Sequence, residues 1–395
     1  RTTMRTWTNW YLVYAVTLGL SFGISMGLTF VVRRYALRWQ ILDHPGDRKM
    51  QKRPVPLLGG VSIVATFYVM VIGSLLLVEP VRQFGIEWLE IHVFQFLGKD
   101  HETKLLGIFA GGLLIAILGL VDDLQALRPW LKLLGQCVAA AVLVISDMRL
   151  NLFAETWLGH RPVASFIVSG LLTVLWVVFM TNSMNLLDNM DGLCAGVAAI
   201  AAFSFFICAL RTREAFICVL LMVFAGAVLG FLIHNLHPAR IYMGDTGAMF
   251  CGYILATLSI LITFYNESTP SRIAIAAPLL ALSVPIFDTV SVVFIRWRAK
   301  VPVFEGDRRH FSHRLVNIGM TQQQAVEFIY LVAAVTGLGA GLLRQVNTVG
   351  TVIILAQTSG VFLLIVLIMS AGDKGWRVPS RESTKTPRKP RGGRA

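Results

Sequence analysis

Carboxylate and amide side chains gather in the segment TNSMNLLDNMDG, although long apolar stretches lie on both sides of it. Asp188 and Asp191 lie three residues apart, and Asn182 and Asn185 continue the same spacing upstream. Since residues three apart share one face of a helix, the spacing predicts one polar face that opens or ends at Gly192. A buried amide–carboxylate network that locks helices together is the structural alternative. A functional site is favoured, because ionisable residues inside a membrane are functional by default.

Two further acidic segments could bind a cation. Asp122 and Asp123 close an apolar stretch, and adjacent carboxylates repel each other unless a cation neutralises the pair. A hard divalent cation with oxygen ligands, above all Mg²⁺, would do this, whereas a solvated loop start is the ordinary alternative. Asp245 lies between Gly244 and Gly247, and glycine allows close backbone approach to a ligand. An ordinary turn would also suit that segment.

A basic segment, DRRHFSH, supplies Arg308, Arg309, His310 and His313. Zinc binding by the two histidines is disfavoured, because neither cysteine nor further histidine lies nearby in the sequence. Arginine and histidine beside carboxylates and Mg²⁺ fit recognition of a diphosphate better. A basic loop that meets lipid headgroups is the alternative.

The composition indicates which elements must position these residues. Of the 395 residues, 55% are hydrophobic and 14% are charged, whereas a soluble domain has about a quarter charged residues. Apolar stretches of about 18 or more residues predict an all-α polytopic membrane protein with about eleven spans. The first span is predicted to be retained, since the apolar part of a signal peptide is shorter. The predicted spans are 11–32, 58–78, 105–121, 130–146, 166–184, 193–210, 215–233, 248–264, 273–295, 326–343 and 347–370.

The distribution of basic residues predicts the orientation. Segments after the odd-numbered spans hold 24 of the 35 Lys and Arg residues, and the positive-inside bias makes these segments cytoplasmic. The N-terminus is then outside and the tail inside. Topology therefore explains the net charge of +13 without nucleic acid as a partner. Residues 1–370 are predicted to form one membrane domain, and residues 371–395 a disordered basic cytoplasmic tail.

All the polar segments fall on the predicted cytoplasmic side, which predicts an active-site cleft at that face. Several carboxylates with basic residues and Mg²⁺ are what phosphoryl transfer needs, and a site at the bilayer surface suggests a lipid substrate. The alternative from another class is a secondary transporter with Asp188, Asp191 and Asp245 as a proton or cation relay. Transporter sites tend to lie near the bilayer midplane between repeats, whereas these acids lie at span ends and no inverted repeat is evident.

Four segments carry a family resemblance: GLVDDL, NSMNLLDNMDGLCAG, NLHPARIYMGDTG and DRRHFSHRL. Over residues 11–345, the chain resembles the polyprenyl-phosphate N-acetylhexosamine-1-phosphate transferases of the bacterial cell envelope (glycosyltransferase family 4). The resemblance implies a reaction that depends on Mg²⁺, with Mn²⁺ as a substitute, in the bacterial inner membrane. Undecaprenyl phosphate would attack a UDP-N-acetylhexosamine, UMP would leave, and a polyprenyl-diphosphate-linked sugar would remain.

The resemblance also implies roles for individual residues. Asp122 and Asp123 would handle the lipid phosphate and, with Asp245, ligate Mg²⁺. Asp188 and Asp191 would support the nucleotide and the metal. The implied substrate-binding residues are Lys132 for a phosphate, Arg309, His310 and His313 for the diphosphate or sugar, and Asn185 and Asn235 in the same cleft, joined by Asn182 through its helical spacing.

Two branches of the family fit to different degrees. Muramoyl-pentapeptide transferases usually have three consecutive histidines in the last loop, whereas this chain has HFSH and a first loop RKMQKRPVPLLGG. Both segments resemble the branch that uses UDP-GlcNAc to start O-antigen, enterobacterial common antigen or teichoic-acid linkage synthesis. Ser312 and Gln51 stand where that branch often has histidine, so the exact sugar stays open. The oligomeric state is also open, and a homodimer is one alternative.

Overall fold

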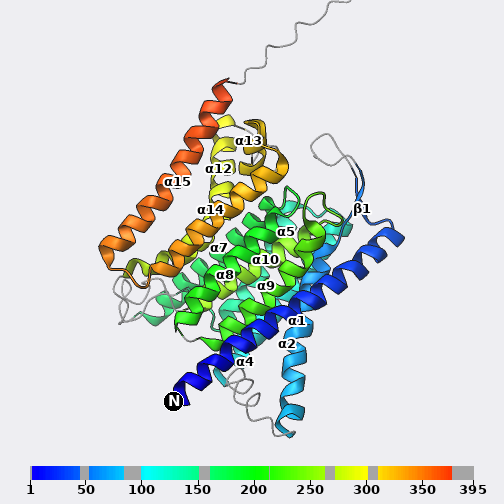
Figure 1. Ribbon diagram of the computed structural model, residues 1–395, viewed down its shortest axis with the longest axis vertical. Helices are drawn as coiled ribbons and strands as arrows, with labels where there is room; N and C mark the ends of the chain where they lie inside the picture. The colour runs from blue at the N-terminus through cyan, green and yellow to red at the C-terminus, as the bar shows by residue number, and fades with distance from the viewer. Residues whose placement is uncertain are drawn as a thin grey trace, which may run out of the picture.

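A computed structural model describes residues 2–44, 53–83, 99–150, 161–212, 214–262, 272–300 and 310–375. Arg309 and residues 376–395 of the predicted tail lie outside these ranges. The described chain is helical apart from one short hairpin and its connections (Figure 1). Its helices are α1 (Thr2–Arg38), α2 (Gly59–Gln83), α4 (Lys99–Leu124), α5 (Pro129–Ile145), α7 (Pro162–Leu187), α8 (Leu193–Thr212), α9 (Ala215–Asn235), α10 (Gly244–Leu261), the 3₁₀ helix η2 (Arg272–Ala276), α11 (Ala277–Ala281), α12 (Ser283–Ala299), α13 (Phe311–Asn317), α14 (Gln322–Leu342) and α15 (Thr348–Gly375), and its strands are β1 (Leu42–Asp43) and β2 (Val55–Pro56).

The predicted class, an all-α polytopic membrane protein, is confirmed. Among the described residues, nine helices are long and apolar enough to cross a membrane, or ten if one bent pair counts as a span. All eleven predicted stretches form helices, but two of them are not among the nine membrane-length helices. The helix over 130–146, α5, has only 17 residues. The stretch 273–295 is not straight, because Ile273–Ala281 and Ser283–Ala299 meet at 76°.

Proline gives the physical reason for this bend. Pro285 lies in the first turn of α12 and has no backbone N–H with which to bond the carbonyl four residues earlier, in α11. A helix can begin at such a position but cannot run through it undisturbed. Hydropathy alone does not distinguish one straight span from two helices that meet at an angle.

The centre of the molecule is formed by α8, α9 and α10. In α9 and α10, 78% of the apolar window is buried, against 11% in α15, which lies along the outer edge (Figure 1). Small residues allow the close packing of α1 across α9: Ser21 Oγ donates to Val223 O at 2.6 Å. A Cβ at Gly230 would lie 2.4 Å from the carbonyl oxygen of Phe22. The apolar side chains that stay exposed on α1 and α15, like those on the other outer helices, are suited to contact with lipid.

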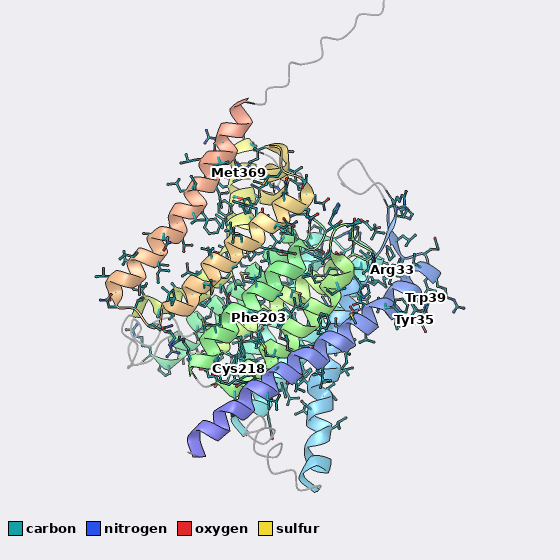
Figure 2. All side chains as sticks on the ribbon, viewed as in Figure 1. Arg33, Tyr35, Trp39, Phe203, Cys218 and Met369 are labelled. Atoms are coloured by element: carbon teal, nitrogen blue, oxygen red, sulfur yellow. The ribbon has the colours of Figure 1, made fainter. Side chains whose placement is uncertain are left out.

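At the end of α1 nearest β1, residues 55–60 are hydrogen-bonded through their backbone to the connection between α9 and α10. Gly60 N donates to Met243 O at 2.8 Å, and Tyr242 N donates to Pro56 O at 2.8 Å. This end also carries Tyr35 and Trp39, both exposed, beside Arg33 (Figure 2). Since Tyr and Trp gather where membrane meets water, this end of the bundle lies at such an interface.

Candidate active site

Asp123, at the end of α4, caps the N-terminus of α10. Its Oδ1 accepts from Asp245 N at 2.7 Å, and its Oδ2 accepts from Thr246 N at 3.0 Å and Thr246 Oγ1 at 2.6 Å. The first N–H groups of a helix have no partner within the helix, and a carboxylate satisfies them. Gly244 leaves room for it, since a Cβ there would lie 2.6 Å from Asp123 Oδ2. Asp123 therefore holds the backbone of Asp245 in place. A role of Asp123 in metal binding stays a prediction.

Lys132 joins two of the predicted acidic segments. Its Nζ donates to Asp122 Oδ2 at 2.7 Å and also to Asp245 Oδ2. Asn185 Nδ2 donates to the other oxygen of Asp245 at 2.9 Å. Four residues that lie far apart in the sequence, on α4, α5, α7 and α10, therefore meet at one end of the bundle, as the sequence predicts.

Asp188 and Asp191 do not lie on a helical face with Asn182 and Asn185, so this part of the prediction is wrong. The helix α7 ends at Leu187, and both carboxylates belong to the turn that leads into α8. Gly192 closes this turn with a φ of 76°, a left-handed conformation that suits glycine. Because asparagine and aspartate compete for backbone hydrogen bonds, they favour such a turn over continued helix.

The environment of Asp188 is strongly negative. Burial, followed by the negative charges of Asp245, Asp123 and Asp191, raises the pKa of Asp188 to about 8. Of these three neighbouring carboxylates, Asp245 is paired with the ammonium of Lys132, so negative charge is in excess around Asp188. A site with this excess of negative charge attracts a cation.

Asp191 pairs with a histidine that the sequence analysis missed. His237 Nδ1 lies 2.7 Å from Asp191 Oδ2, and Ala239 N donates to the same oxygen at 3.1 Å. These bonds tie the connection between α9 and α10 to the turn between α7 and α8. The available signal was the position of His237 inside the NLHPARIYMGDTG segment, two residues after Asn235.

All three predicted substrate-binding amides have hydrogen-bond partners within the protein. Asn235 Oδ1 accepts from Gly192 N at 3.0 Å, and Asn182 Nδ2 donates to Gln136 at 2.6 Å. These contacts resemble the buried amide network considered as an alternative. Of the three, Asn185 contacts an acidic residue of the site, Asp245. Substrate binding by Asn182 and Asn235 stays a prediction.

The described residues of the basic segment DRRHFSH, His310 to His313, lie at the start of α13. His310 is the residue just before this helix, and His313 lies one turn later with its ring centroid 6.4 Å away. Ser312 Oγ donates to Asn189 Oδ1, which connects α13 to the turn that carries Asp188 and Asp191. The two histidines are therefore held beside the acidic turn.

Asp288 is a second residue that the sequence analysis missed. It lies in α12 with 1% of its surface exposed, and its Oδ2 is 2.9 Å from His310 Nδ1. The signal was an ionisable residue inside the predicted span 273–295, which is unusual without a functional reason.

The donor set fits Mg²⁺ better than zinc. Among the described residues, no group of three or more His, Cys, Asp or Glu side chains is arranged as a complete metal site. Structural zinc needs four such ligands, whereas Mg²⁺ is commonly held by one or two carboxylates together with substrate phosphates. Asp122 and Asp245 already hold one cationic group between them, the ammonium of Lys132.

Comparisons with known proteins bear on the family of the chain. A sequence profile for glycosyl transferase family 4 matches residues 105–263, which include Asp122, Asp188 and Asp245. The chain is 32% identical over 318 residues to the probable undecaprenyl-phosphate N-acetylglucosaminyl 1-phosphate transferase of Bacillus subtilis, covering 80% of this chain and 81% of that protein. It is 31% identical over 326 residues to the decaprenyl-phosphate N-acetylglucosaminephosphotransferase of Mycolicibacterium smegmatis, covering 78% and 77%.

A more distant relative is the phospho-N-acetylmuramoyl-pentapeptide-transferase of Levilactobacillus brevis, which is 30% identical over 226 residues and covers 54% of this chain. The similarity to the Bacillus subtilis protein extends over 80% of the chain. The chain therefore belongs to glycosyl transferase family 4, the polyprenyl-phosphate N-acetylhexosamine-1-phosphate transferases, and is a membrane-embedded phosphosugar transferase.

Proposed function

We propose that the protein transfers N-acetylglucosamine 1-phosphate from UDP-GlcNAc to undecaprenyl phosphate and so starts a cell-envelope polysaccharide. The convergence of Asp122, Lys132, Asn185 and Asp245 from four helices carries the proposal. The choice of sugar is supported by the relatives named for N-acetylglucosamine, which cover more of the chain than the muramoyl-pentapeptide transferase does. The inner membrane is the proposed location, with the site and the tail in the cytoplasm and the N-terminus outside.

The reaction exchanges one phosphoanhydride for another. An oxygen of the lipid phosphate attacks the phosphorus that carries the sugar, the bond from this phosphorus to the UMP oxygen breaks, and UMP leaves. No external energy source is needed, because one anhydride forms as the other breaks. Both reactants are anions, so the site must supply positive charge beside its carboxylates.

Residues of this chain supply part of that charge and the alignment. Lys132 presents an ammonium between Asp122 and Asp245, where it would also reach a phosphoryl oxygen. Asp123 keeps Asp245 at the N-terminus of α10, an end whose dipole favours anions. Neutralisation of the phosphoryl charge is the chemistry that Mg²⁺ supplies when bound, with Asp122 and Asp245 as its proposed ligands.

An apolar groove supports a lipid as one substrate. It has a volume of about 340 Å³ and opens between α7 and α12. Helix α7 leads directly to Asp188, and α12 carries Asp288, so a chain in the groove would lie beside helices that reach the site. The groove is lined by Phe179, Thr289, Val290, Val293, Phe294 and Trp297.

The transporter alternative gains no such support. Asp188 lies beyond the end of α7 and Asp245 in the first turn of α10, whereas transporter sites lie near the bilayer midplane. The relatives described above are named as transferases.

Release of UMP by the purified protein tests the proposed function. We expect UMP from UDP-GlcNAc only when both undecaprenyl phosphate and Mg²⁺ are present, and no UMP after EDTA treatment. UDP-N-acetylmuramoyl-pentapeptide and UDP-GalNAc serve as competing donors. Release without the lipid, or release only with the pentapeptide donor, would contradict the proposal.

A further inference from the structure

Asp288 is a buried carboxylate whose two oxygens have different partners. Its Oδ2 bonds His310 Nδ1 at 2.9 Å, and its Oδ1 accepts from Phe311 N at 2.6 Å. With 1% of its surface exposed, Asp288 has lost its hydration, and a buried charge of this kind is retained only where it is paired and hydrogen-bonded. Both of its partners belong to the start of α13.

The bend before α12 accounts for this contact. The chain turns by 76° between α11 and α12, and from there α12 packs against both α7 and α13. Helix α13 has only seven residues, and Phe311, which opens it, is held by Asp288. One side chain thus fixes both the ring of His310 and the backbone that follows it.

The pairing determines which nitrogen of His310 carries the proton. An ionised carboxylate only accepts hydrogen bonds, so Nδ1 must be the donor in the pair. In neutral histidine the other nitrogen, Nε2, is then an acceptor. Among the described residues, the hydrogen bond of the His310 ring is the one between Nδ1 and Asp288 Oδ2. A phosphoryl oxygen cannot donate to Nε2, whereas a sugar hydroxyl or an acetamido N–H can.

We propose that Asp288 is a positioning residue for His310, holding it as the Nδ1–H tautomer so that Nε2 accepts a hydrogen bond from the sugar of the donor substrate. The assignment of the ligand rests on the proposed function. The tautomer and the orientation of the ring rest on the structure alone. His310 thereby recognises the N-acetylhexosamine rather than its diphosphate.

Nitrogen NMR of the substrate-free protein tests the positioning. In detergent-solubilised protein labelled with ¹⁵N-histidine, a His310→Ala variant assigns the His310 signals. We expect the neutral Nδ1–H tautomer in the unmodified protein and the Nε2–H tautomer in Asp288→Asn, whose amide can donate to Nδ1 while its oxygen still accepts from Phe311. A neutral Nε2–H tautomer in the unmodified protein would overturn the proposal even if the variant failed to fold.

Kinetics test the ligand. We expect Asp288→Asn and His310→Ala each to lower kcat/KM for UDP-GlcNAc by roughly 10- to 100-fold, with KM for undecaprenyl phosphate within about twofold of normal. In the double variant, kcat/KM should fall no further than in the more impaired of the two single variants, because Asp288 acts through His310. Multiplied losses would show that the two act separately and would overturn the proposal.

A matched control and the unmodified protein complete the design. Asp147→Asn removes another aspartate that is hydrogen-bonded to a basic side chain, Arg149, but is exposed, and should leave kcat/KM unchanged. If the unmodified protein released no UMP from any UDP-sugar, the proposed function and the sugar assignment would both fail. The NMR result would still decide whether Asp288 positions His310.

Discussion

At the scale of single residues, the carboxylates at this end of the bundle have separate tasks. Asp123 uses both oxygens to cap α10, whereas Asp245 directs its oxygens to Lys132 and Asn185. Asp188 is the carboxylate whose proton affinity rises most clearly among its negative neighbours. Substituting a carboxylate that caps a helix should lower stability, whereas substituting one that binds substrate or metal should lower turnover alone.

Replacing Asp245 or Asp123 with asparagine should abolish detectable turnover in both cases, but only the second change should lower stability. Asp245→Asn removes a proposed Mg²⁺ ligand, whereas Asp123→Asn replaces one of the two accepting oxygens by an NH₂ group that cannot accept, at a cost of about 0.5–1.5 kcal/mol for a lost hydrogen bond. UMP release and thermal unfolding in detergent measure the two effects. An active Asp245→Asn protein would remove Asp245 from the site, and an unchanged Tm for Asp123→Asn would refute the capping role.

At the scale of elements, helix ends and their connections carry the site. The N-terminus of α10 is capped from α4, the turn after α7 is tied to the connection before α10, and α13 is held by α12. The spans themselves are apolar and serve to bring these ends to one side. Changes that displace a helix end without touching a charged side chain should therefore also reduce activity.

Gly244→Ala tests this dependence. Gly244 has a φ of 71°, and its new Cβ would press on Asp123, so we expect the capping bonds to break and turnover to fall, with a cost of about 1–3 kcal/mol in stability. Gly319→Ala is the control, because Gly319 has a φ of 110° but no neighbour within 4 Å of a Cβ. It should lose comparable stability and keep its activity. Equal loss of activity in both variants would point to strain alone.

The groove between α7 and α12 gives a second prediction at this scale. Val293→Trp would fill part of the groove, so KM for undecaprenyl phosphate should rise by roughly tenfold while KM for UDP-GlcNAc stays within about twofold. The kinetic comparison needs both substrates varied in turn. Val352→Trp on α15 is the control, since Val352 is also exposed but is not among the residues that line the groove. If KM rose for UDP-GlcNAc and not for undecaprenyl phosphate, the groove would not be the binding site of the lipid.

At the scale of the whole molecule, the protein is one helical membrane body with its polar segments at one end. The basic tail has almost no apolar residues, so it is not expected to contribute to folding of the membrane domain. Deleting residues 376–395 should leave UMP release in detergent within about twofold of the full chain. A truncated protein that is folded but inactive would show that the tail takes part in the reaction.

The class of protein, the approximate spans and the residue types of the site can be predicted from the amino-acid sequence alone. Hydropathy and charge are local properties, so eleven apolar stretches and the segments that contain Asp122, Asp188, Asp245 and His310 can be recognised one at a time. The family resemblance rests on the same local segments, and the relatives confirmed it. Even the meeting of these segments at one end follows from counting the spans between them.

The contacts of each polar group, in contrast, depend on how the helices pack. Asp123 and Thr246 are 123 residues apart, and Asp288 and His310 belong to separate helices, so their pairing depends on how helices pack and where they bend. Because of the bend before α12, Asp288 contacts the start of α13, a contact that a straight span over 273–295 does not predict. The end of α7 placed Asp188 and Asp191 in a turn instead of on a helical face. Side-chain spacing along the chain cannot specify such contacts, because they are made between segments whose separation in space is set by the packed bundle.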